Sequence, residues 1–566
     1  MALVCCEVVR RGRFLVADPY LTPGHPLALG RRGSTVAHEG ELVLVEMAPG
    51  GGRARVAERL GSPSDVRALL HGLAGEAGAA LPFPAAAVAE AQDLPRDPAP
   101  PSGDRRDLRD RVAFTVDPGT AKDHDDAITV ERTGDGLRVL VHIADVTAVV
   151  GLGSALDHEA IERGFSSYLP GRVDPMLPPA LSAGLCSLVP DRPRDVVTVE
   201  IPFGADLQPG RASFYRAQIV SRRRFTYADV ERILAGAGDP LAEPLRDAQR
   251  IAASLRARRA ARGALQIVSR ELEITLDGER VADVRMIGEP AAHALVEELM
   301  ILANEAVAEL LARRKTPALF RVHDQPAPAG VERLYDQLAD LDVPTPALPE
   351  MLPPSEAAAA IGRASDAVAR HARALGRGAE AWTTLVLRAV MQARYAPSNG
   401  GHAGLATPFY CHFTSPIRRY SDVTVHRALL GAIGAGPVSE RHGLDDLAVA
   451  LSEREREWSR LERRGAAICL AAHLRARPED DEVVRPGEIT GLIGGGLFVR
   501  FDGVYDGMVP SRRLGPEDFE VSDLGTALIG REGRRFRLGD RIDVTVDRVD
   551  VPRGRVSLSP RVGRST

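Results

Sequence analysis

The 566-residue sequence has almost no lysine, since only Lys122 and Lys315 among its 72 basic residues are not arginine. Its five cysteines are an odd number without CxxC spacing, which argues against a disulfide framework and against a structural zinc site. No segment approaches the roughly 18 uninterrupted apolar residues of a membrane span. The N-terminus, MALVCCEVVRRGRF, lacks the basic start, apolar core and cleavage site of a signal peptide. We therefore expect a cytoplasmic protein with reduced thiols and no membrane partner.

A strong excess of positive charge is also missing, because the net charge is −5. A nucleic-acid-binding function therefore cannot rest on bulk charge, and any phosphate-binding surface must be local. The 44% hydrophobic and 26% charged composition is typical of a globular protein. The chain is too long for one hydrophobic core, which predicts two to four domains.

The order of patterns along the chain predicts an α+β protein with small β-barrels flanking a central mixed α/β domain. Residues 1–62 contain short β-like runs broken by Gly and Pro, as in a small barrel. Residues 63–104 predict a linking helix, with Ser64 as its N-cap, and a Pro-rich linker. Residues 105–478 mix strands and helices, and residues 482–562 return to short strands that suit a five-stranded OB-type barrel.

The most informative stretch is FTVDPGTAKDHDDAITV (114–130), which contains Asp117, Asp123, Asp125 and Asp126. Carboxylates packed this closely repel one another unless protons or cations neutralise them. The flanking AFTV and AITV are β-like, so the cluster lies where two apolar segments enter a core. Mg²⁺ prefers carboxylate oxygens and water and leaves positions open for phosphate, and two such ions serve phosphodiester hydrolysis. A solvated acidic loop is the alternative interpretation.

A second stretch, YCHFTSPIRRYSD (410–422), combines Arg418 and Arg419 with Tyr410 and Tyr420. Planar guanidinium groups bind phosphates and aromatic rings stack on bases. The alternative is a salt-bridged turn that precedes a helix. From its residues alone, the stretch is compatible with both.

These two stretches resemble signatures of the RNase II/RNase R (RNB-domain) family of exoribonucleases. Further blocks resemble the family in the same order: VHIADVT (141–147), SSYLPGRVDPMLP (166–178), LVEELMILAN (295–304), RVHDQP (321–326) and MQARYAPSNGGHAGLA (391–406). The resemblance implies a cold-shock-like barrel at the N-terminus, a central RNB catalytic domain and a C-terminal S1 domain. Longer members have two barrels before the catalytic domain, whereas this sequence has room for one.

The resemblance also implies roles for individual residues. Asp117, Asp123, Asp125 and Asp126 match the aspartates that hold Mg²⁺, and together with Arg418, which stabilises charge on the phosphate, they form the expected catalytic set. The expected substrate-binding residues are Tyr168, which stacks on the terminal base, Glu297 or Glu298 at the ribose, His412, Arg419, and the candidate stacking faces Phe498 and Phe501. Barrels also bury aromatic rings, so a core position remains the alternative for the two phenylalanines.

The expected function is Mg²⁺-dependent 3′–5′ hydrolysis of single-stranded RNA to 5′-mononucleotides by a monomer. The arginines of SRRRF (221–225) could hold the RNA backbone or form a solvated run. Some family members carry a second base-stacking aromatic, for which RGALQIV (262–268) offers no candidate, and the lysine-rich tail of members that degrade structured RNA is missing. Two other classes stay open: an RNA-binding regulator with a degenerate RNB centre, and an endonuclease or DNA-directed nuclease.

Overall fold

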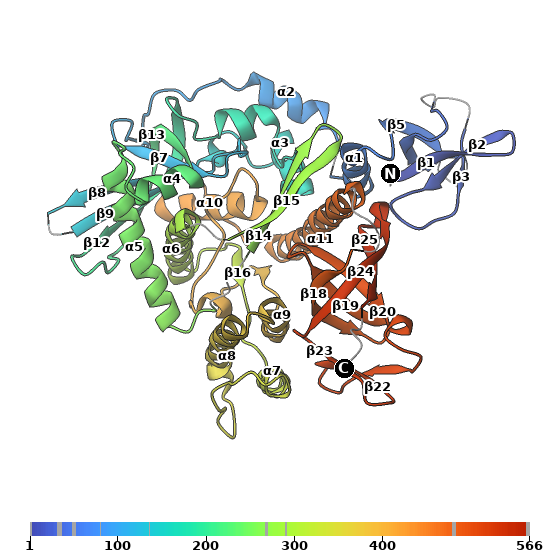
Figure 1. Ribbon diagram of the computed structural model, residues 1–566. Coiled ribbons are helices and arrows are strands. Elements are labelled where there is room, and N and C mark those ends of the chain that lie inside the picture. The colour runs from blue at the N-terminus through green and yellow to red at the C-terminus, as the bar shows by residue number, and fades with distance from the viewer. Residues whose placement is uncertain are drawn as a thin grey trace.

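The computed structural model describes residues 3–30, 37–47, 53–79, 81–134, 136–265, 270–288, 291–477 and 483–561. Figure 1 shows a central domain of strands and helices, with the N-terminal sheet and the C-terminal barrel on the same side of it. This arrangement confirms the predicted α+β organisation. The predicted boundary at 478 and 482 lies outside the described residues. In the part of the chain that is described, no helix is long and apolar enough to cross a membrane.

The N-terminal sheet has the strand order β3-β2-β1-β4-β5. Its strands are β1 (Leu3–Arg11), β2 (Phe14–Pro19), β3 (Leu27–Ala28), β4 (Leu42–Glu46) and β5 (Arg55–Gly61). The two edges meet where the Gly30 N–H donates to the Ala54 carbonyl and the Ala54 N–H donates to the Ala28 carbonyl, each at 2.9 Å. The sheet therefore curls as a small barrel does.

Helix α1 (Val66–Glu76) follows, and its N-cap is Asp65 rather than the predicted Ser64. The Asp65 carboxylate accepts a hydrogen bond from the Arg67 N–H at 2.8 Å, which satisfies one of the free donors of the first turn. After α2 (Ala85–Asp93) the chain has neither helix nor strand until β6. This Pro-rich segment is nevertheless fixed to the central domain through ion pairs from Asp97 to Arg192 and Arg194.

The central sheet has the order β12-β9-β8-β7-β13-β6, and β12 also pairs with β13, so that the sheet closes on itself. Its strands are β6 (Arg106–Asp107), β7 (Ala113–Asp117), β8 (Asp126–Thr133), β9 (Gly136–Ala144), β12 (Pro193–Phe203) and β13 (Ser213–Thr226). Helices α4 (Tyr227–Leu234), α5 (Ala242–Ala261), α6 (Ala291–Arg314) and α10 (Tyr420–Ile433) bury their apolar residues in the same core cluster as these strands.

The central domain contains further elements outside this sheet. They are α3 (Ala155–Arg163), β10 (Ser167–Leu169), β11 (Arg172–Asp174), β14 (Arg270–Asp277), β15 (Arg280–Gly288), β16 (Phe320–Val322), α7 (Pro328–Asp340), α8 (Pro354–Leu375), α9 (Ala379–Ala389), β17 (Arg394–Ala396) and α11 (Leu444–Ala476). The long helix α11 contacts α1, the β10 hairpin and the C-terminal barrel. It therefore connects both β-rich ends to the central domain (Figure 1).

The C-terminal strands close into the predicted five-stranded barrel, in the order β18-β19-β20-β25-β24. The strands are β18 (Arg485–Ile493), β19 (Gly496–Phe501), β20 (Tyr505–Pro510), β24 (Arg541–Asp550) and β25 (Arg555–Pro560), and β21 (Phe519–Val521), β22 (Ala527–Gly530) and β23 (Arg535–Arg537) form a separate small sheet. The Trp382 indole N–H donates to the Leu538 carbonyl at 3.1 Å, which ties α9 to this region.

Candidate active site

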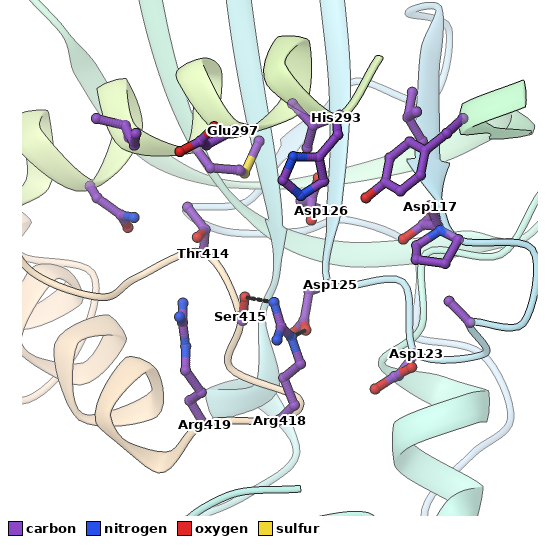
Figure 2. Close-up of a pocket in the computed structure, with 18 of the residues that line it drawn as sticks. Asp117, Asp123, Asp125, Asp126, His293, Glu297, Thr414, Ser415, Arg418 and Arg419 are labelled. Atoms are coloured by element: carbon purple, nitrogen blue, oxygen red, sulfur yellow. Dashed lines mark hydrogen bonds and ion pairs between the residues drawn. The ribbon is translucent and has the colours of Figure 1, made fainter. Parts of the chain in front are cut away.

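The acidic cluster lies in the connection between β7 and β8. Asp117 is the last residue of β7 and Asp126 is the first residue of β8, while Asp123 and Asp125 lie in the turn between them. All four line one cavity of about 460 Å³. Figure 2 shows this cavity with the aspartates on one side and residues of α6 and of the segment before α10 on the other. Three segments that are distant in the sequence therefore meet here.

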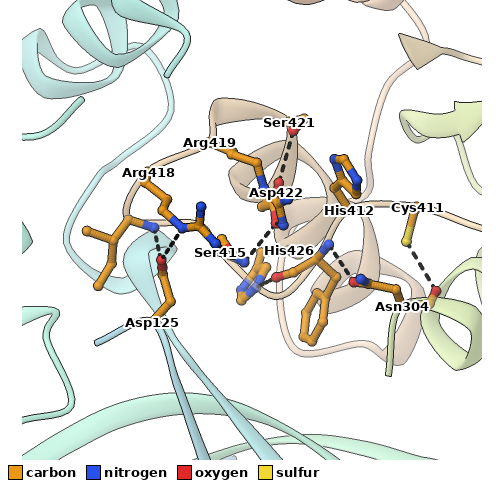
Figure 3. Close-up of polar contacts among 12 residues, drawn as sticks. Asp125, Asn304, Cys411, His412, Ser415, Arg418, Arg419, Ser421, Asp422 and His426 are labelled. Atoms are coloured by element: carbon orange, nitrogen blue, oxygen red, sulfur yellow. Dashed lines mark hydrogen bonds and ion pairs between the residues drawn. The ribbon is translucent and has the colours of Figure 1, made fainter. Parts of the chain in front are cut away.

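Asp125 is held from two sides. Its Oδ1 accepts a hydrogen bond from the Ile417 N–H at 2.7 Å, and its Oδ2 lies 3.4 Å from Nε of Arg418 (Figure 3). Its side chain is buried, and burial raises its pKa well above the ordinary value although Arg418 opposes the shift. The carboxylate is therefore positioned by the protein but not fully neutralised by it.

The Asp126 carboxylate has no hydrogen bond or ion pair with any residue that the structure describes, although its backbone pairs with Ile143 of β9. Burial, and next the negative charge of Asp117, raise its pKa to about 7. Asp117 itself has Oδ2 2.9 Å from Nδ1 of the buried His124. A solvated acidic loop does not describe such a cluster, because Asp125 is buried and the other three aspartates are only partly exposed. Like charges repel more strongly in such a setting than in water.

These residues fit a hard divalent cation in a specific way. Among the described residues, no three His, Cys, Asp or Glu side chains are grouped closely enough to form a ready-made metal site. Mg²⁺ does not require one, because it is usually held by one or two carboxylates and completes its shell with water and substrate phosphate. Excess buried negative charge beside a cavity is the feature that such an ion would compensate. The expected Mg²⁺ therefore fits the donor set, although no three protein ligands are preassembled for it.

The two arginines of the second stretch differ in their surroundings. The Arg418 side chain is 45% exposed, lines the cavity, and donates from Nη2 to the Ser415 hydroxyl at 3.0 Å. Arg419 also lines the cavity, but its guanidinium is paired with Asp422 at 2.7 Å. The alternative of a salt-bridged turn thus describes Arg419, whereas Arg418 faces the cavity. Of the two tyrosines, only Tyr410 lines the cavity.

Tyr168 reaches the cavity from the β10–β11 hairpin. Its ring is 38% exposed, and its hydroxyl donates to Oδ2 of Asp123 at 2.8 Å. Its backbone N–H donates to Oε1 of Glu462, on α11, at 2.9 Å. The ring is therefore accessible for stacking, while the phenol contacts one of the candidate metal ligands.

The structure distinguishes the two glutamates of α6. Glu297 lines the cavity, whereas Glu298 is buried and forms an ion pair with Arg259 at 2.5 Å. The expected substrate contact therefore fits Glu297 only. His412 does not line the cavity either. It is partly buried, and its Nδ1 lies 2.8 Å from the Tyr395 hydroxyl. A direct substrate contact does not fit its position.

The two candidate stacking residues of the C-terminal barrel are also separated. Phe498 is 41% exposed, whereas Phe501 is fully buried in the hydrophobic core. The two residues are an odd number of positions apart on β19, and alternate residues of a strand face opposite sides. The core alternative thus describes Phe501, and only Phe498 offers a free ring face.

The arginines of SRRRF bind protein groups. Arg222 donates to the Arg109 carbonyl, Arg223 pairs with Asp239, and Arg224 donates to the carbonyls of the acidic turn. Each of the three guanidinium groups thus contacts protein groups, and a contact with the RNA backbone stays a prediction. In the RGALQIV stretch, residues 266–268 lie outside the described residues.

Two further aromatic side chains line the cavity and were not singled out from the sequence. Tyr227 begins α4, directly after the capping residue Thr226, and His293 lies in the first turn of α6. Their ring centroids are 5.6 Å apart in an edge-to-face arrangement. Neither residue belongs to a dense local motif. The sequence offered one indication that they belong to the site. Each residue lies at the start of a helix that follows a strand, and side chains at such positions lie near the end of a sheet.

Comparison with known proteins gives a consistent result. The RNB domain family matches residues 105–434, and the S1 RNA binding domain family matches residues 477–561. Ribonuclease R of Aquifex aeolicus is 32% identical over 560 residues, which cover 94% of this chain and 77% of that protein. Ribonuclease R of Escherichia coli is 35% identical over 476 residues, which cover 80% of this chain and 57% of that protein. The chain thus spans little more than half the length of the latter relative.

Among solved structures, that of Mycoplasma genitalium RNase R in complex with ribose methylated single-stranded RNA superposes with a TM-score of 0.86. The alignment covers 99% of this chain and 90% of that chain, at 24% sequence identity. The likeness extends through both flanking β-rich regions and concerns the fold.

Proposed function

Because the chain belongs to the RNase II/RNase R (RNB-domain) family of 3′–5′ exoribonucleases, we propose that it degrades single-stranded RNA from the 3′ end and releases 5′-mononucleotides with the help of Mg²⁺. The observation that carries this proposal is the cavity at the β7–β8 connection. It combines four aspartates with the accessible Arg418 and the accessible ring of Tyr168.

The aspartates are the proposed holders of the metal. Asp117, Asp123, Asp125 and Asp126 present carboxylate oxygens to one cavity, and burial has raised the pKa of Asp125 and of Asp126. The chemistry that bound Mg²⁺ would supply is stabilisation of negative charge on the phosphate and activation of a water molecule. The hydrogen bond from Ile417 holds Asp125 in place for this role.

The proposed reaction breaks one bond at the last phosphate of the RNA. The oxygen of a water molecule forms a new bond to phosphorus, and the bond from phosphorus to the 3′ oxygen of the preceding nucleotide breaks. That 3′ oxygen takes up a proton, and the terminal nucleotide leaves with a 5′ phosphate. Arg418 is placed to donate hydrogen bonds to the phosphate as its negative charge grows, and such donors lower the barrier by about 3–4 kcal/mol in comparable sites.

Other cavity residues are proposed to hold the nucleotide. The exposed ring of Tyr168 stacks on the terminal base, since stacking tolerates any base and supports sequence-independent binding. Glu297 accepts hydrogen bonds from a ribose hydroxyl. Phe498 offers a further stacking face on the C-terminal barrel. We also propose that the protein acts as a monomer and in the cytoplasm.

Product analysis tests the function. Linear RNA labelled at its 5′ end, DNA of the same sequence and a circular RNA are incubated with the protein and Mg²⁺, and the products are resolved by length. We expect stepwise shortening of linear RNA, release of 5′-mononucleotides, and intact DNA and circles. Cleavage of the circle would show endonuclease action instead, and Asp125→Asn serves as the inactive control.

The alternative of an RNA-binding regulator with a degenerate centre makes the opposite prediction. A degenerate centre has lost at least one member of the set, whereas Asp117, Asp123, Asp125, Asp126 and Arg418 are all present and line one cavity. A wild-type protein that binds RNA tightly and leaves it intact in Mg²⁺ would support the regulator.

A further inference from the structure

The acidic turn has few hydrogen bonds of its own. Between the end of β7 and the start of β8, the backbone bond within the turn runs from the Ala121 N–H to the Pro118 carbonyl at 3.1 Å. Most of the other bonds come from outside it, including those from Arg224 to the Pro118 and Gly119 carbonyls. The positions of Asp123 and Asp125 therefore depend on residues elsewhere in the chain.

Ser187 provides the central outside contact. Its hydroxyl accepts a hydrogen bond from the His124 N–H at 3.0 Å and donates one to the Lys122 carbonyl at 2.9 Å. These two contacts lie on either side of Asp123. The next residue, Leu188, donates its N–H to the His124 carbonyl at 3.0 Å. One buried hydroxyl thus uses both its donor and its acceptor capacity on the backbone of the turn.

Ser187 is itself held rigidly. Its carbonyl accepts hydrogen bonds from Nε of Arg194 at 2.9 Å and from the Val189 N–H at 2.8 Å. The Arg194 side chain is buried and also binds Asp97, of the Pro-rich segment, at 2.8 Å. Because these bonds fix Ser187 to other parts of the chain, its hydroxyl can determine the position of the acidic turn.

We infer that Ser187 is a positioning residue for the proposed metal-binding carboxylates. It fixes the backbone of Lys122 and His124, and thereby the spacing of Asp123 and Asp125 and the contact of His124 with Asp117. Ser187 itself does not line the cavity, so it acts on the reaction only through the turn. The inference rests on the proposed function, because it concerns the same site.

Ser187→Ala tests the inference, and Ser182→Ala is the matched control. Ser182 is a buried serine five positions before Ser187, in the π-helical turn Leu181–Leu185. Among the described residues, its hydroxyl donates only to the Pro178 carbonyl, at 3.4 Å. For each variant the turnover of RNA is measured as a function of Mg²⁺ concentration. RNA affinity is measured in EDTA, and the rise in melting temperature on adding Mg²⁺ is measured without RNA.

We expect Ser187→Ala to lower turnover or to raise the half-saturating Mg²⁺ concentration by about 10- to 100-fold, as loss of groups that orient metal ligands does. RNA affinity in EDTA should stay near that of the wild type, and the Mg²⁺-dependent rise in melting temperature should shrink. Ser182→Ala should leave all three readouts unchanged. Equal behaviour of the two variants would overturn the inference.

Two further measurements keep the test decisive. If Ser187→Ala unfolds, two other variants are compared at equal folded fraction. Ser187→Thr retains the hydroxyl and should keep most of the Mg²⁺ response. Ser187→Cys has a weaker hydrogen-bonding group and should not. Equal responses of the Thr and Cys variants would count against positioning by the hydroxyl. Failure of the wild-type protein to degrade RNA at any Mg²⁺ concentration would instead refute the proposed function.

Discussion

Two carboxylates at the same end of the central sheet, the partly buried Asp126 and the fully buried Asp145, show opposite electrostatics. Asp126 begins β8 and pairs with Ile143 of β9, while Asp145 follows the end of β9 by one residue. Burial and then Asp117 raise the pKa of Asp126 to about 7. Burial also acts to raise the pKa of Asp145, but Arg216 and Arg105 outweigh it, and the pKa is lowered.

The difference lies in the partners. Asp145 has Arg216 at 2.9 Å, Arg105 at 3.0 Å and the Thr147 hydroxyl at 2.6 Å. Asp126 has only the longer-range field of Arg418 to oppose the charge of Asp117. At Asp145, nearby arginines compensate the charge of the carboxylate. At Asp126, in the proposed active site, the charge stays uncompensated until a cation binds. This imbalance is a sounder marker of a functional site than burial alone.

The largest expected effect on turnover comes from removing a carboxylate charge in the proposed active site. Asp125→Asn retains an oxygen for the Ile417 N–H and removes a carboxylate from the proposed metal site. We expect turnover to fall about 10³-fold or more, because metal and electrostatic stabilisation of the transition state are lost. RNA affinity in EDTA, measured by filter binding, should change little. A variant that trims RNA at the wild-type rate would remove Asp125 from the catalytic set.

Arg418 and Arg419 allow a similar comparison between a residue of the proposed active site and a structural residue. Arg418→Ala should lower turnover by about 10²–10³-fold. It should lower the melting temperature less than Arg419→Ala does, since Arg418 is half-exposed and its contact with Asp125 is longer, at 3.4 Å. Arg419→Ala should mainly destabilise the protein, because it leaves the buried Asp422 without its partner. Thermal unfolding and single-turnover assays of both variants separate the two roles. The reverse pattern would show that Arg419 is the group that acts on the phosphate.

Stability in the absence of metal sharpens the contrast between the two aspartates. Asp145→Asn breaks a buried, paired network, which typically costs about 3–5 kcal/mol. Asp126→Asn should instead raise the melting temperature in EDTA at pH 8, where the raised pKa means that the folded state carries an unfavourable charge. Added Mg²⁺ should stabilise the wild type and should have less effect on Asp126→Asn. A lower melting temperature of Asp126→Asn in EDTA would contradict the inference that the charge of Asp126 is uncompensated.

The sequence predicted the main features of this fold because its patterns are local. Short strand-like runs with turn residues between them predicted the five-stranded C-terminal barrel. The helical pattern within residues 63–104 predicted α1, with Ser64 as the cap in place of Asp65. Both residues are good N-caps, and only the backbone geometry distinguishes them. The acidic cluster was visible for the same reason, since its four aspartates lie within ten positions.

The roles of residues were harder to predict where they depend on the direction in which a side chain points. Glu297 and Glu298 are adjacent on α6, so that a rotation of about 100° per residue sends one into the cavity and the other to Arg259. Phe498 and Phe501 face opposite sides of β19, and the structure shows which of the two sides is the core. Ser187 had no signal at all, because its role arises from contacts with residues more than 60 positions away.

The smallest expected effect concerns the contact between the stacking ring and the acidic turn. Tyr168→Phe keeps a ring face and removes the hydroxyl that donates to Asp123 at 2.8 Å. It should therefore preserve the length of the final RNA fragment and shift the half-saturating Mg²⁺ concentration by about two- to tenfold, the range of one lost hydrogen bond of roughly 0.5–1.5 kcal/mol. Tyr168→Ala removes the ring as well, so it should change the final fragment. If the Phe variant changes fragment length as much as the Ala variant, the phenol itself contacts the RNA, and the contact with Asp123 belongs only to the free protein.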